Sequence, residues 1–384
     1  MSEEIIKKRL SDIIATDLSR EIPRIRGSGT EVEVNSRRAV LFCSNDYLGL
    51  SVHPAVTGAL REAVEDAQAG SAASRLVSGD RPEHEELEKR FASFMKVERA
   101  RLFSTGYQAN VGVLSALAQK GDLIFSDELN HASIIDGARL SRADVVVYGH
   151  RDVEDLEKKI AGKHTGGLKI IVSDAVFSMD GDPAPLAGLV DLARRYGAIV
   201  YLDEAHSFGL MGKGGRGLAF QEQVDDKVDI RLVTFGKAMG LCGAVVLASS
   251  DVISLVTNTA RSLLYSTSMP SYIARSAMAS LDQIEKGDEV RKKLRQNVRL
   301  FRELSIAAGL EITDSVSPIQ PLITGTEQRG LRASRMMLDR GYFIQAIRPP
   351  TVAPGTSRLR ITLSALHTQK QISGLIENLC DVLK

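Results

Sequence analysis

Residues 198–206 read Ala-Ile-Val-Tyr-Leu-Asp-Glu-Ala-His, and residues 231–240 read Arg-Leu-Val-Thr-Phe-Gly-Lys-Ala-Met-Gly. Each stretch is an apolar run of strand length followed by small and polar residues. In an α/β protein, the residues that follow parallel strands meet at one edge of the sheet, where ligands bind. The two stretches therefore predict a parallel sheet with a site at its strand ends that contains Asp203, His206 and Lys237.

Further apolar runs of strand length support a large sheet, and they cover residues 122–126, 144–148, 169–173 and 244–248. Helical patterns alternate with these runs, at residues 82–95, 106–119, 152–161 and 186–196. This alternation is typical of an α/β fold in which helices flank both faces of a mostly parallel sheet. Residues 271–308 are expected to form one or two long charged helices.

The ends of the chain have different patterns. Residues 1–40 read as a charged helix followed by a polar arm. After residue 318, strands are expected at 319–324, 343–347 and 358–362, and helices at 328–340 and 368–383. We therefore expect an N-terminal helix and arm over residues 1–45, a large domain over 46–285 and a small C-terminal α+β domain over 286–384.

The composition excludes several classes of protein. Of 384 residues, 43% are apolar and 25% charged, and the net charge of +1 argues against nucleic acid or a membrane surface as the main partner. The three cysteines, Cys43, Cys242 and Cys380, are too few and too scattered for a disulfide framework or a zinc site. The start of the chain lacks the apolar core of a signal peptide, and no apolar run approaches the ~20 residues of a membrane span. We expect a cytoplasmic protein without a metal.

Lys237 lies among small and apolar residues directly after a predicted strand. Most loop lysines are solvated charges, but desolvation lowers the pKa of the amine and makes it a nucleophile and a base. Pyridoxal phosphate (PLP) chemistry requires a lysine that forms a Schiff base and a buried carboxylate that faces the pyridinium nitrogen. Lys237 and Asp203 are candidates for this pair.

Other interpretations of these motifs are weaker. Asp203-Glu204-Ala205-His206 also matches the DEAH box of helicases, but no Gly-Lys pair in the chain is followed by the Ser or Thr that a phosphate-binding loop needs. An aspartate at a strand end is also a common helix cap. Residues 212–217 match G-x-G-x-x-G without the required strand-to-helix setting, so we interpret them as a flexible loop.

Two predicted helix starts carry further candidates. Residues 104–110 read Ser-Thr-Gly-Tyr-Gln-Ala-Asn after a short apolar run, and the free N–H groups of a helix start suit a phosphate. His131 begins another predicted helix, in Asn130-His131-Ala132-Ser133. Taken singly, these two segments are better explained as an ordinary capped helix and as a capping or surface histidine.

Taken together, seven blocks resemble the α-oxoamine synthases, which are PLP enzymes with an aspartate-aminotransferase-like fold. The blocks occur in the family's order, at residues 44–50, 74–79, 130–133, 176–181, 203–206, 234–237 and 265–270. The resemblance runs from about residue 40 to the C-terminus. It implies the PLP-dependent transferase fold type I, with a mostly parallel sheet flanked by helices and a small C-terminal α+β domain.

The resemblance implies a role for each matching position around the cofactor. Lys237 would hold PLP as a Schiff base, and Asp203 would pair with its pyridine nitrogen. His206 would hydrogen-bond the phenolic oxygen, and His131 would stack on the ring. The residues implied to seat the cofactor and its phosphate are Gly106, Tyr107, Ser178 and Thr234.

The resemblance also implies partners and substrate contacts. Ser266 and Thr267 would reach the phosphate of the neighbouring subunit, because active sites of this family lie at the interface of a homodimer. Arg360 would bind the carboxylate of the amino acid, with Asn45 close by. Thr351 would lie near the acyl substrate.

Two further blocks, at residues 317–321 and 347–352, resemble the branch of the family that joins L-alanine to pimeloyl-CoA or a pimeloyl carrier protein in biotin biosynthesis. The catalytic core does not distinguish this branch from glycine C-acetyltransferase, 5-aminolevulinate synthase or serine palmitoyltransferase. A silent partner subunit is the alternative without enzyme activity. The presence of Lys237, Asp203, His206 and His131 argues against that alternative.

The chain departs from the family pattern at three places, one of which is Glu204, where some members have a second aspartate. Relatives often have Gly-Ser-Gly-Gly-Ser where residues 70–74 read Gly-Ser-Ala-Ala-Ser, and the added methyl groups affect backbone that approaches a ligand. The arginine that some relatives use to bind the acyl chain has no clear counterpart, and Arg20 and Arg24 are nearby candidates.

Overall fold

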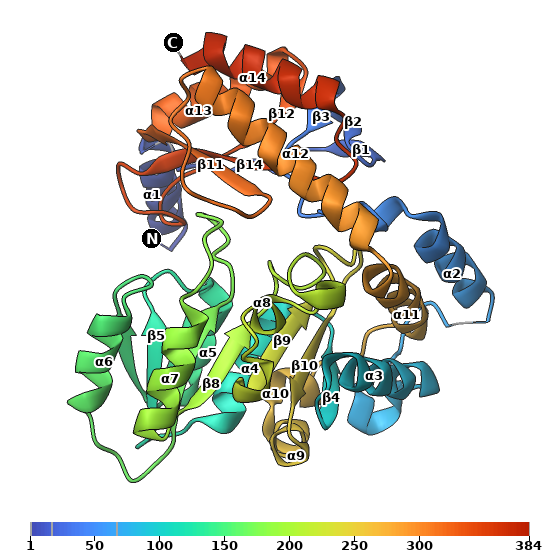
Figure 1. Ribbon diagram of the computed structural model, residues 1–384, viewed down its shortest axis with the longest axis vertical. Coiled ribbons are helices and arrows are strands. Elements are labelled where there is room, and N and C mark those ends of the chain that lie inside the picture. The colour runs from blue at the N-terminus through green and yellow to red at the C-terminus, as the bar shows by residue number, and fades with distance from the viewer. Residues whose placement is uncertain (1, 17, 67, 384) are drawn as a thin grey trace. The chain divides into compact units, whose positions relative to one another are not determined.

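The computed structural model describes residues 2–16, 18–66 and 68–383, so the expected limits at residues 1 and 384 lie outside it. The chain divides into two compact units (Figure 1). The larger unit comprises Leu48–Ser178 and Pro183–Arg291. The smaller unit comprises Met1–Tyr47, Met179–Asp182 and Lys292–Lys384, so it combines both ends of the chain.

Among the described residues, seven strands form the sheet of the larger unit, in the order β4-β10-β9-β8-β7-β5-β6. They are β4 (Arg99–Phe103), β5 (Leu123–Asp127), β6 (Asp144–Tyr148), β7 (Lys169–Asp174), β8 (Ile199–Asp203), β9 (Ile230–Thr234) and β10 (Ala244–Ala248). All neighbouring pairs are parallel except those that β10 forms with β4 and β9. The predicted mostly parallel sheet is confirmed.

Helices cover both faces of this sheet (Figure 1). One face packs against α4 (Gly106–Leu117), α5 (Ala132–Ser141) and α9 (Ser250–Thr259). The other face packs against α6 (Val153–Ala161), α7 (Leu186–Tyr196) and α8 (Leu218–Gln221). Successive residues of a strand pack on opposite faces of the sheet. Ile170 and Val172 belong to the hydrophobic core on the first face, and Ile171 belongs to the core on the second. Burial on both faces explains why the strands are continuous apolar runs.

The remaining elements of the larger unit lie outside these two layers or in its loops. They are η1 (Leu50–Val52), α2 (Pro54–Glu65), η2 (Arg75–Gly79), α3 (Pro82–Met95), η3 (Lys213–Gly215), η4 (Asp225–Lys227), α10 (Arg261–Leu264) and α11 (Ser271–Glu285). α11 packs against α2 and α3. On α3, the Phe91 ring stacks on that of Phe235, with centroids 5.4 Å apart, so this helix supports the segment that follows β9.

The smaller unit has two antiparallel-rich sheets with helices. The strands of the first sheet follow the order β1 (Ile25–Ser28), β2 (Glu31–Val34), β3 (Arg37–Leu41) and β12 (Tyr342–Phe343). The strands of the second sheet follow the order β11 (Ile319–Gly325), β14 (Ser357–Thr362) and β13 (Gln345–Ile347). The other elements at the two ends of the chain are α1 (Ser2–Ala15), α12 (Asp288–Ala307), α13 (Glu327–Asp339) and α14 (Gln369–Leu383).

The structure differs from the sequence prediction in the N-terminal segment and near residue 343. The expected polar arm contains β1, β2 and β3, and β3 pairs in parallel with β12. Val32 and Val34 are buried on one side of β2, but an alternation over only four residues is too short to recognise. The single strand expected at 343–347 is divided between β12 and β13, which belong to different sheets.

Candidate active site

The strand ends of the larger unit bring the main candidates together. Asp203 is the last residue of β8, is 4% exposed, and pairs in register with Asp174 on β7. Thr234 is the last residue of β9, and the half-buried Lys237 follows it by three positions. The residues predicted to form the site therefore lie at the carboxyl edge of the sheet.

Asp203 is held by two hydrogen bonds. Its Oδ1 accepts from the backbone N–H of Ala205 at 3.0 Å, and its Oδ2 accepts from Nδ2 of Asn110 at 2.7 Å. The amide of Asn110 cannot turn around, because its Oδ1 accepts from the hydroxyl of Tyr201 at 2.7 Å. The carboxylate is thus fixed and acceptor-only, as needed to face a protonated ring nitrogen.

The same amide connects Asp203 to His131. Nδ2 of Asn110 also donates to Oγ of Ser133 at 2.9 Å, and this hydroxyl lies 2.7 Å from Nδ1 of His131. The backbone N–H of Ser133 points to the same Nδ1 at 3.3 Å, so Nδ1 is an acceptor and Nε2 carries the proton. His131 caps the start of α5 and exposes its ring, which leaves room for a stacked aromatic group.

Charges at the strand ends influence one another. Desolvation lowers the pKa of His131, and the Lys237 ammonium lowers it further while Asp203 acts in the opposite direction. Burial raises the pKa of Asp174, as does the neighbouring Asp203 carboxylate. Oδ2 of Asp174 accepts from the backbone N–H of His131 at 2.7 Å, so this second carboxyl fixes the histidine.

The loop that carries Lys237 is pinned at both ends. The N–H of Phe235 donates to Gly243 O at 2.8 Å, and the N–H of Gly240 donates to Lys237 O at 2.9 Å. Gly240 has φ 69°, and a Cβ there would lie 2.6 Å from the Cα of Ser51. Only glycine fits this left-handed and crowded position, and it sets the path of the chain just after the lysine.

A second group of candidates surrounds the start of α4. Thr105 caps this helix by accepting from the N–H of Gln108 at 3.1 Å. Gly106 lies so close to Thr234 that a Cβ would collide with its methyl group. In the part of the chain that the structure describes, Oγ1 of Thr234 is buried without a hydrogen-bond partner. A phosphate at the helix start would give that hydroxyl a partner and would suit the free N–H groups.

The residues at this edge of the sheet suit PLP. The site has an amine at Lys237, a fixed carboxylate at Asp203, a histidine with an exposed ring at His131, and an unpaired hydroxyl at Thr234 next to a helix start. Tyr107 is 46% exposed, and its ring meets that of His131 edge-on, with centroids 6.4 Å apart. A planar ring, an aldehyde and a phosphate match this set of groups.

The other predicted cofactor residues also belong to the larger unit. His206 is 4% exposed in the turn after β8, and Ser178 is half-buried after β7. Ser266 and Thr267 lie beside the start of α4 of their own chain. Nε2 of Gln108 is 3.4 Å from the Ser266 hydroxyl, and a serine that precedes α4 donates to Thr267 O at 3.2 Å.

The predicted substrate residues belong to the smaller unit. Arg360 on β14 is 7% exposed and donates from Nη1 to Oδ1 of Asn45 at 3.1 Å. The hydroxyl of Tyr47 donates to the same oxygen at 3.1 Å, and burial raises the pKa of Tyr47 to about 12 although Arg360 lowers it. Arg360 and Asn45 are therefore together, as expected. Thr351 instead accepts from Nη2 of Arg20 at 3.5 Å.

Sequence reasoning missed the residues that hold the site residues in place. Asn110 and Asp174 had no assigned role, although Asn110 ends the quoted segment 104–110 and Asp174 ends a predicted strand. Glu204 is fully buried, and its carboxylate accepts from the N–H groups of Leu218 at 2.8 Å and Ala219 at 3.1 Å. It therefore caps α8 and anchors the turn that follows Asp203.

Among the described residues, no group of three or more His, Cys, Asp or Glu side chains could hold a metal ion. Over those same residues, no helix is long and apolar enough to cross a membrane.

Comparison with known proteins identifies the family. The family model described as aminotransferase class I and II matches residues 37–379. The chain belongs to this family, in its α-oxoamine synthase branch. The fold is the predicted PLP-dependent transferase fold type I, and the resemblance recognised in the sequence is confirmed.

Similar sequences include 8-amino-7-oxononanoate synthases. That of Geobacter sulfurreducens is 44% identical over 370 residues, which cover 96% of this chain and 95% of the relative. That of Pelobacter propionicus is 42% identical over 380 residues, which cover 98% and 97%.

Solved structures with a similar fold include two members of the branch. A serine palmitoyltransferase from S. paucimobilis has a TM-score of 0.93 at 29% identity and covers 99% of this chain and 96% of its own. An 8-amino-7-oxononanoate synthase from Francisella tularensis has a TM-score of 0.78 at 30% identity, with coverages of 89% and 97%.

Proposed function

We propose that this α-oxoamine synthase uses pyridoxal phosphate to join L-alanine to a pimeloyl thioester, with loss of carbon dioxide. The products are 8-amino-7-oxononanoate, the precursor that biotin biosynthesis requires, and the free thiol of CoA or of a carrier protein. Relatives with this activity in their name are 42–44% identical over nearly their whole length. The structural observation that carries the proposal is the fixed, buried carboxylate of Asp203 at the strand edge that also bears Lys237.

The cofactor, when bound, supplies an electron sink that stabilises negative charge on the Cα of alanine. Lys237 would hold the cofactor through its aldehyde, and Asp203 would keep a proton on the ring nitrogen. His131 would pack against the ring, and His206 would donate to the phenolic oxygen. The residues that we assign to the phosphate and its surroundings are Gly106, Tyr107, Ser178, Thr234, Ser266 and Thr267.

The chain's own residues then move the proton. Nζ of Lys237 would be the base that takes the proton from the Cα of the bound alanine. The same amine returns a proton after acyl transfer and loss of carbon dioxide. A lysine can do this only if the segment around it is held in place, and the bonds at Phe235 and Gly240 provide that.

Arg360 binds the carboxylate of alanine, because a guanidinium matches a carboxylate through parallel N–H groups. Asn45 orients this guanidinium through the bond to Nη1. We assign Thr351 to the acyl substrate. Its contact with Arg20 makes Arg20, rather than Arg24, our candidate for the arm arginine.

We further propose a homodimer in the cytoplasm, where acyl thioesters are made. Large apolar side chains are exposed close to Ser266. Its neighbour Tyr265 is 72% exposed. In η2, which packs against α10, Leu76 is 62% exposed and Val77 is 78% exposed. Such a group is typical of a surface that another chain covers. Sedimentation of the wild type and of a Val77→Glu variant tests this: the variant should be monomeric.

The function is tested by thiol release from the PLP-loaded protein over a grid of substrates. Alanine, glycine and serine are each paired with acetyl-, succinyl-, pimeloyl- and palmitoyl-CoA, and alanine also with a pimeloyl carrier protein. Release confined to alanine with a pimeloyl thioester supports the proposal. Serine with palmitoyl-CoA is the second candidate, because a serine palmitoyltransferase shares the fold with a TM-score of 0.93. No release from any pair contradicts both.

A further inference from the structure

The segment 265–270 joins α10 to α11 and carries Ser266 and Thr267, but it has no regular secondary structure. The bonds around these two residues are long. Nε2 of Gln108 lies 3.4 Å from Oγ of Ser266, and Oγ of Ser104 lies 3.2 Å from Thr267 O. The position of the two hydroxyl groups therefore depends on how the rest of the segment is anchored.

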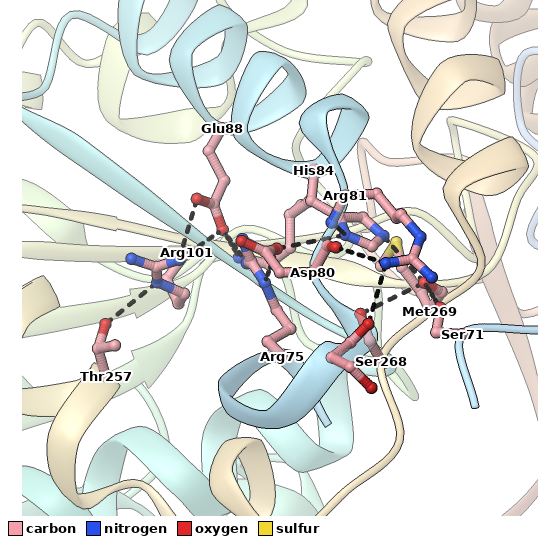
Figure 2. Close-up of polar contacts among 12 residues, drawn as sticks. Ser71, Arg75, Asp80, Arg81, His84, Glu88, Arg101, Thr257, Ser268 and Met269 are labelled. Atoms are coloured by element: carbon pink, nitrogen blue, oxygen red, sulfur yellow. Dashed lines mark hydrogen bonds and ion pairs between the residues drawn. The ribbon is translucent and has the colours of Figure 1, made fainter. Parts of the chain in front are cut away.

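The anchor is the backbone carbonyl of Met269 (Figure 2). It accepts from Oγ of Ser71 at 2.7 Å and from Nε2 of His84 at 2.9 Å. All three residues are buried, with exposures of 5%, 4% and 0% for Met269, Ser71 and His84. A third bond, from the N–H of Ser268 to Ala73 O at 3.0 Å, fixes the adjacent residue.

His84 is held as a donor toward this carbonyl. The N–H of Arg81 donates to Nδ1 of His84 at 3.1 Å at the start of α3, which is closer than Oδ1 of Asp80 at 3.4 Å, so we assign Nδ1 as the acceptor. A neutral imidazole then has its proton on Nε2, which faces Met269 O. Burial lowers the pKa of His84, and the nearby Arg75 cation lowers it further while Asp80 raises it, so the neutral form is favoured.

One turn further along α3, Glu88 fixes the other side of the same region. Its Oε1 accepts from the N–H of Leu102 on the edge strand β4 at 2.8 Å, and its Oε2 pairs with Nη1 of Arg101 at 3.1 Å. It also pairs with Arg75 in η2 (Figure 2). Because β4 leads directly into Ser104 and α4, a single face of α3 fixes both the segment 265–270 and the approach to the helix start.

We propose that His84 is a positioning residue for phosphate recognition, because its bond to Met269 O holds the hydroxyl groups of Ser266 and Thr267 where a cofactor phosphate can reach them. This rests on the proposed function, in which these two hydroxyl groups contact a phosphate. His84 itself does not touch the cofactor. Its effect should therefore appear in the affinity for the phosphate group and not in the affinity for the ring.

The experiment compares two substitutions that separate the two bonds of the imidazole. His84→Asn keeps an acceptor for the N–H of Arg81 but is too short to reach Met269 O. His84→Gln keeps a donor at the distance of Nε2. Full-length protein is stripped of cofactor and titrated with PLP and with pyridoxal, which lacks the phosphate, and binding is followed by absorbance.

His367 provides the matched control in the smaller unit. Its Nδ1 accepts from the N–H of Ser364 at 2.9 Å, and its Nε2 lies 3.0 Å from Leu41 O, so it makes the same two kinds of bond. It is 2% exposed, and none of its bonds involves the segment 265–270. His367→Asn should lower stability without changing the ratio of the affinities for PLP and pyridoxal.

We expect His84→Asn to weaken PLP binding about tenfold, to leave pyridoxal binding unchanged, and to be rescued by His84→Gln. If His84→Asn does not fold, Ser71→Ala should give the same selective loss, because it removes the shorter of the two hydroxyl bonds to Met269 O, at 2.7 Å against 3.3 Å for Oγ of Ser268. An equal loss for both ligands, or no loss, overturns the inference. Wild-type protein that binds pyridoxal as tightly as PLP overturns it too. If the variant loses affinity for PLP but not for pyridoxal, and the wild type has no condensation activity, the inference about His84 is supported and only the proposed function is rejected.

Discussion

Asn110 on α4 donates from Nδ2 to Oδ2 of Asp203 at the end of β8, over 2.7 Å. The two residues are 93 positions apart in the chain and both are buried, at 1% and 4% exposure. The hydroxyl of Tyr201 determines which way the amide faces. One helix thus supplies both the start at Gly106, to which we assign the phosphate, and, one turn later, the group that orients the carboxylate.

Asn110→Ala should uncouple Asp203 from its support. The variant leaves the buried hydroxyl of Tyr201 and one carboxylate oxygen without their partner, which costs about 1–3 kcal/mol of unfolding free energy. We expect kcat to fall by at least about tenfold, because the carboxylate no longer holds one orientation. Urea unfolding and steady-state thiol release measure the two effects.

Asn297→Ala is the control for that variant. Nδ2 of Asn297 donates to Ser364 O at 2.9 Å and His367 O at 3.0 Å in the smaller unit, and the residue is also buried, at 5% exposure. It should lose comparable stability and keep its kcat. Equal kcat losses in both variants would show that Asn110 acts only through stability.

Lys237→Ala should abolish both the absorbance of covalently bound cofactor and all turnover, because no other amine takes the place of Nζ. Lys213→Ala, in the exposed glycine-rich loop, should change neither. Absorbance spectra and thiol release check the pair. A Lys237→Ala protein with undiminished turnover would refute the assignment of the lysine.

Arg360→Lys should raise the KM for alanine by about tenfold or more, since a lysine ammonium lacks the planar fork that binds a carboxylate. Cofactor absorbance should not change, because the assigned cofactor residues belong to the other unit. The exposed Arg332→Ala is the matched control and should leave KM unchanged. An unaltered KM in Arg360→Lys would place the alanine carboxylate elsewhere.

His367 should make stability depend on pH. Burial lowers its pKa from 6.5 to about 4, and the ring stacks on Phe42 at 4.0 Å. Between these values the unfolded chain binds one proton more than the folded chain, so stability is complete above pH 6.5 and falls as the pH approaches 4. The loss is about 3 kcal/mol.

The difference between wild type and His367→Asn isolates this contribution in urea unfolding curves. Asparagine does not titrate, so the advantage of the wild type should shrink as the pH falls through this range. A constant difference across the range would mean that the histidine is not held neutral in the folded protein.

The strand edge with Asp203 and Lys237 was predictable because a buried parallel strand is an apolar run and its end is marked by the first polar residues. The supporting amide of Asn110 was not, because it comes from a helix whose position depends on the whole fold. The pairing of β3 with β12 was hidden for the same reason, since it joins Val40 to Tyr342.

The alanines at positions 72 and 73 show a second kind of structural effect that the sequence does not reveal. The sequence suggested that their methyl groups affect ligand fit. In the structure, Ala72 has φ 58°, a left-handed conformation that glycine adopts more easily. It lies between Ser71, which anchors Met269, and Ala73, which anchors Ser268. The consequence of the departure is therefore backbone strain in that support, which a residue pattern does not reveal.

The most direct test of the central claim follows the carboxyl carbon of alanine. Alanine labelled at this carbon is incubated with the PLP-loaded protein and a pimeloyl thioester, and labelled carbon dioxide, free thiol and 8-amino-7-oxononanoate are measured together. We expect equal amounts of all three, and none when the thioester is omitted or Lys237 is replaced by alanine. Thiol release without labelled carbon dioxide, or carbon dioxide without the thioester, would contradict decarboxylative condensation.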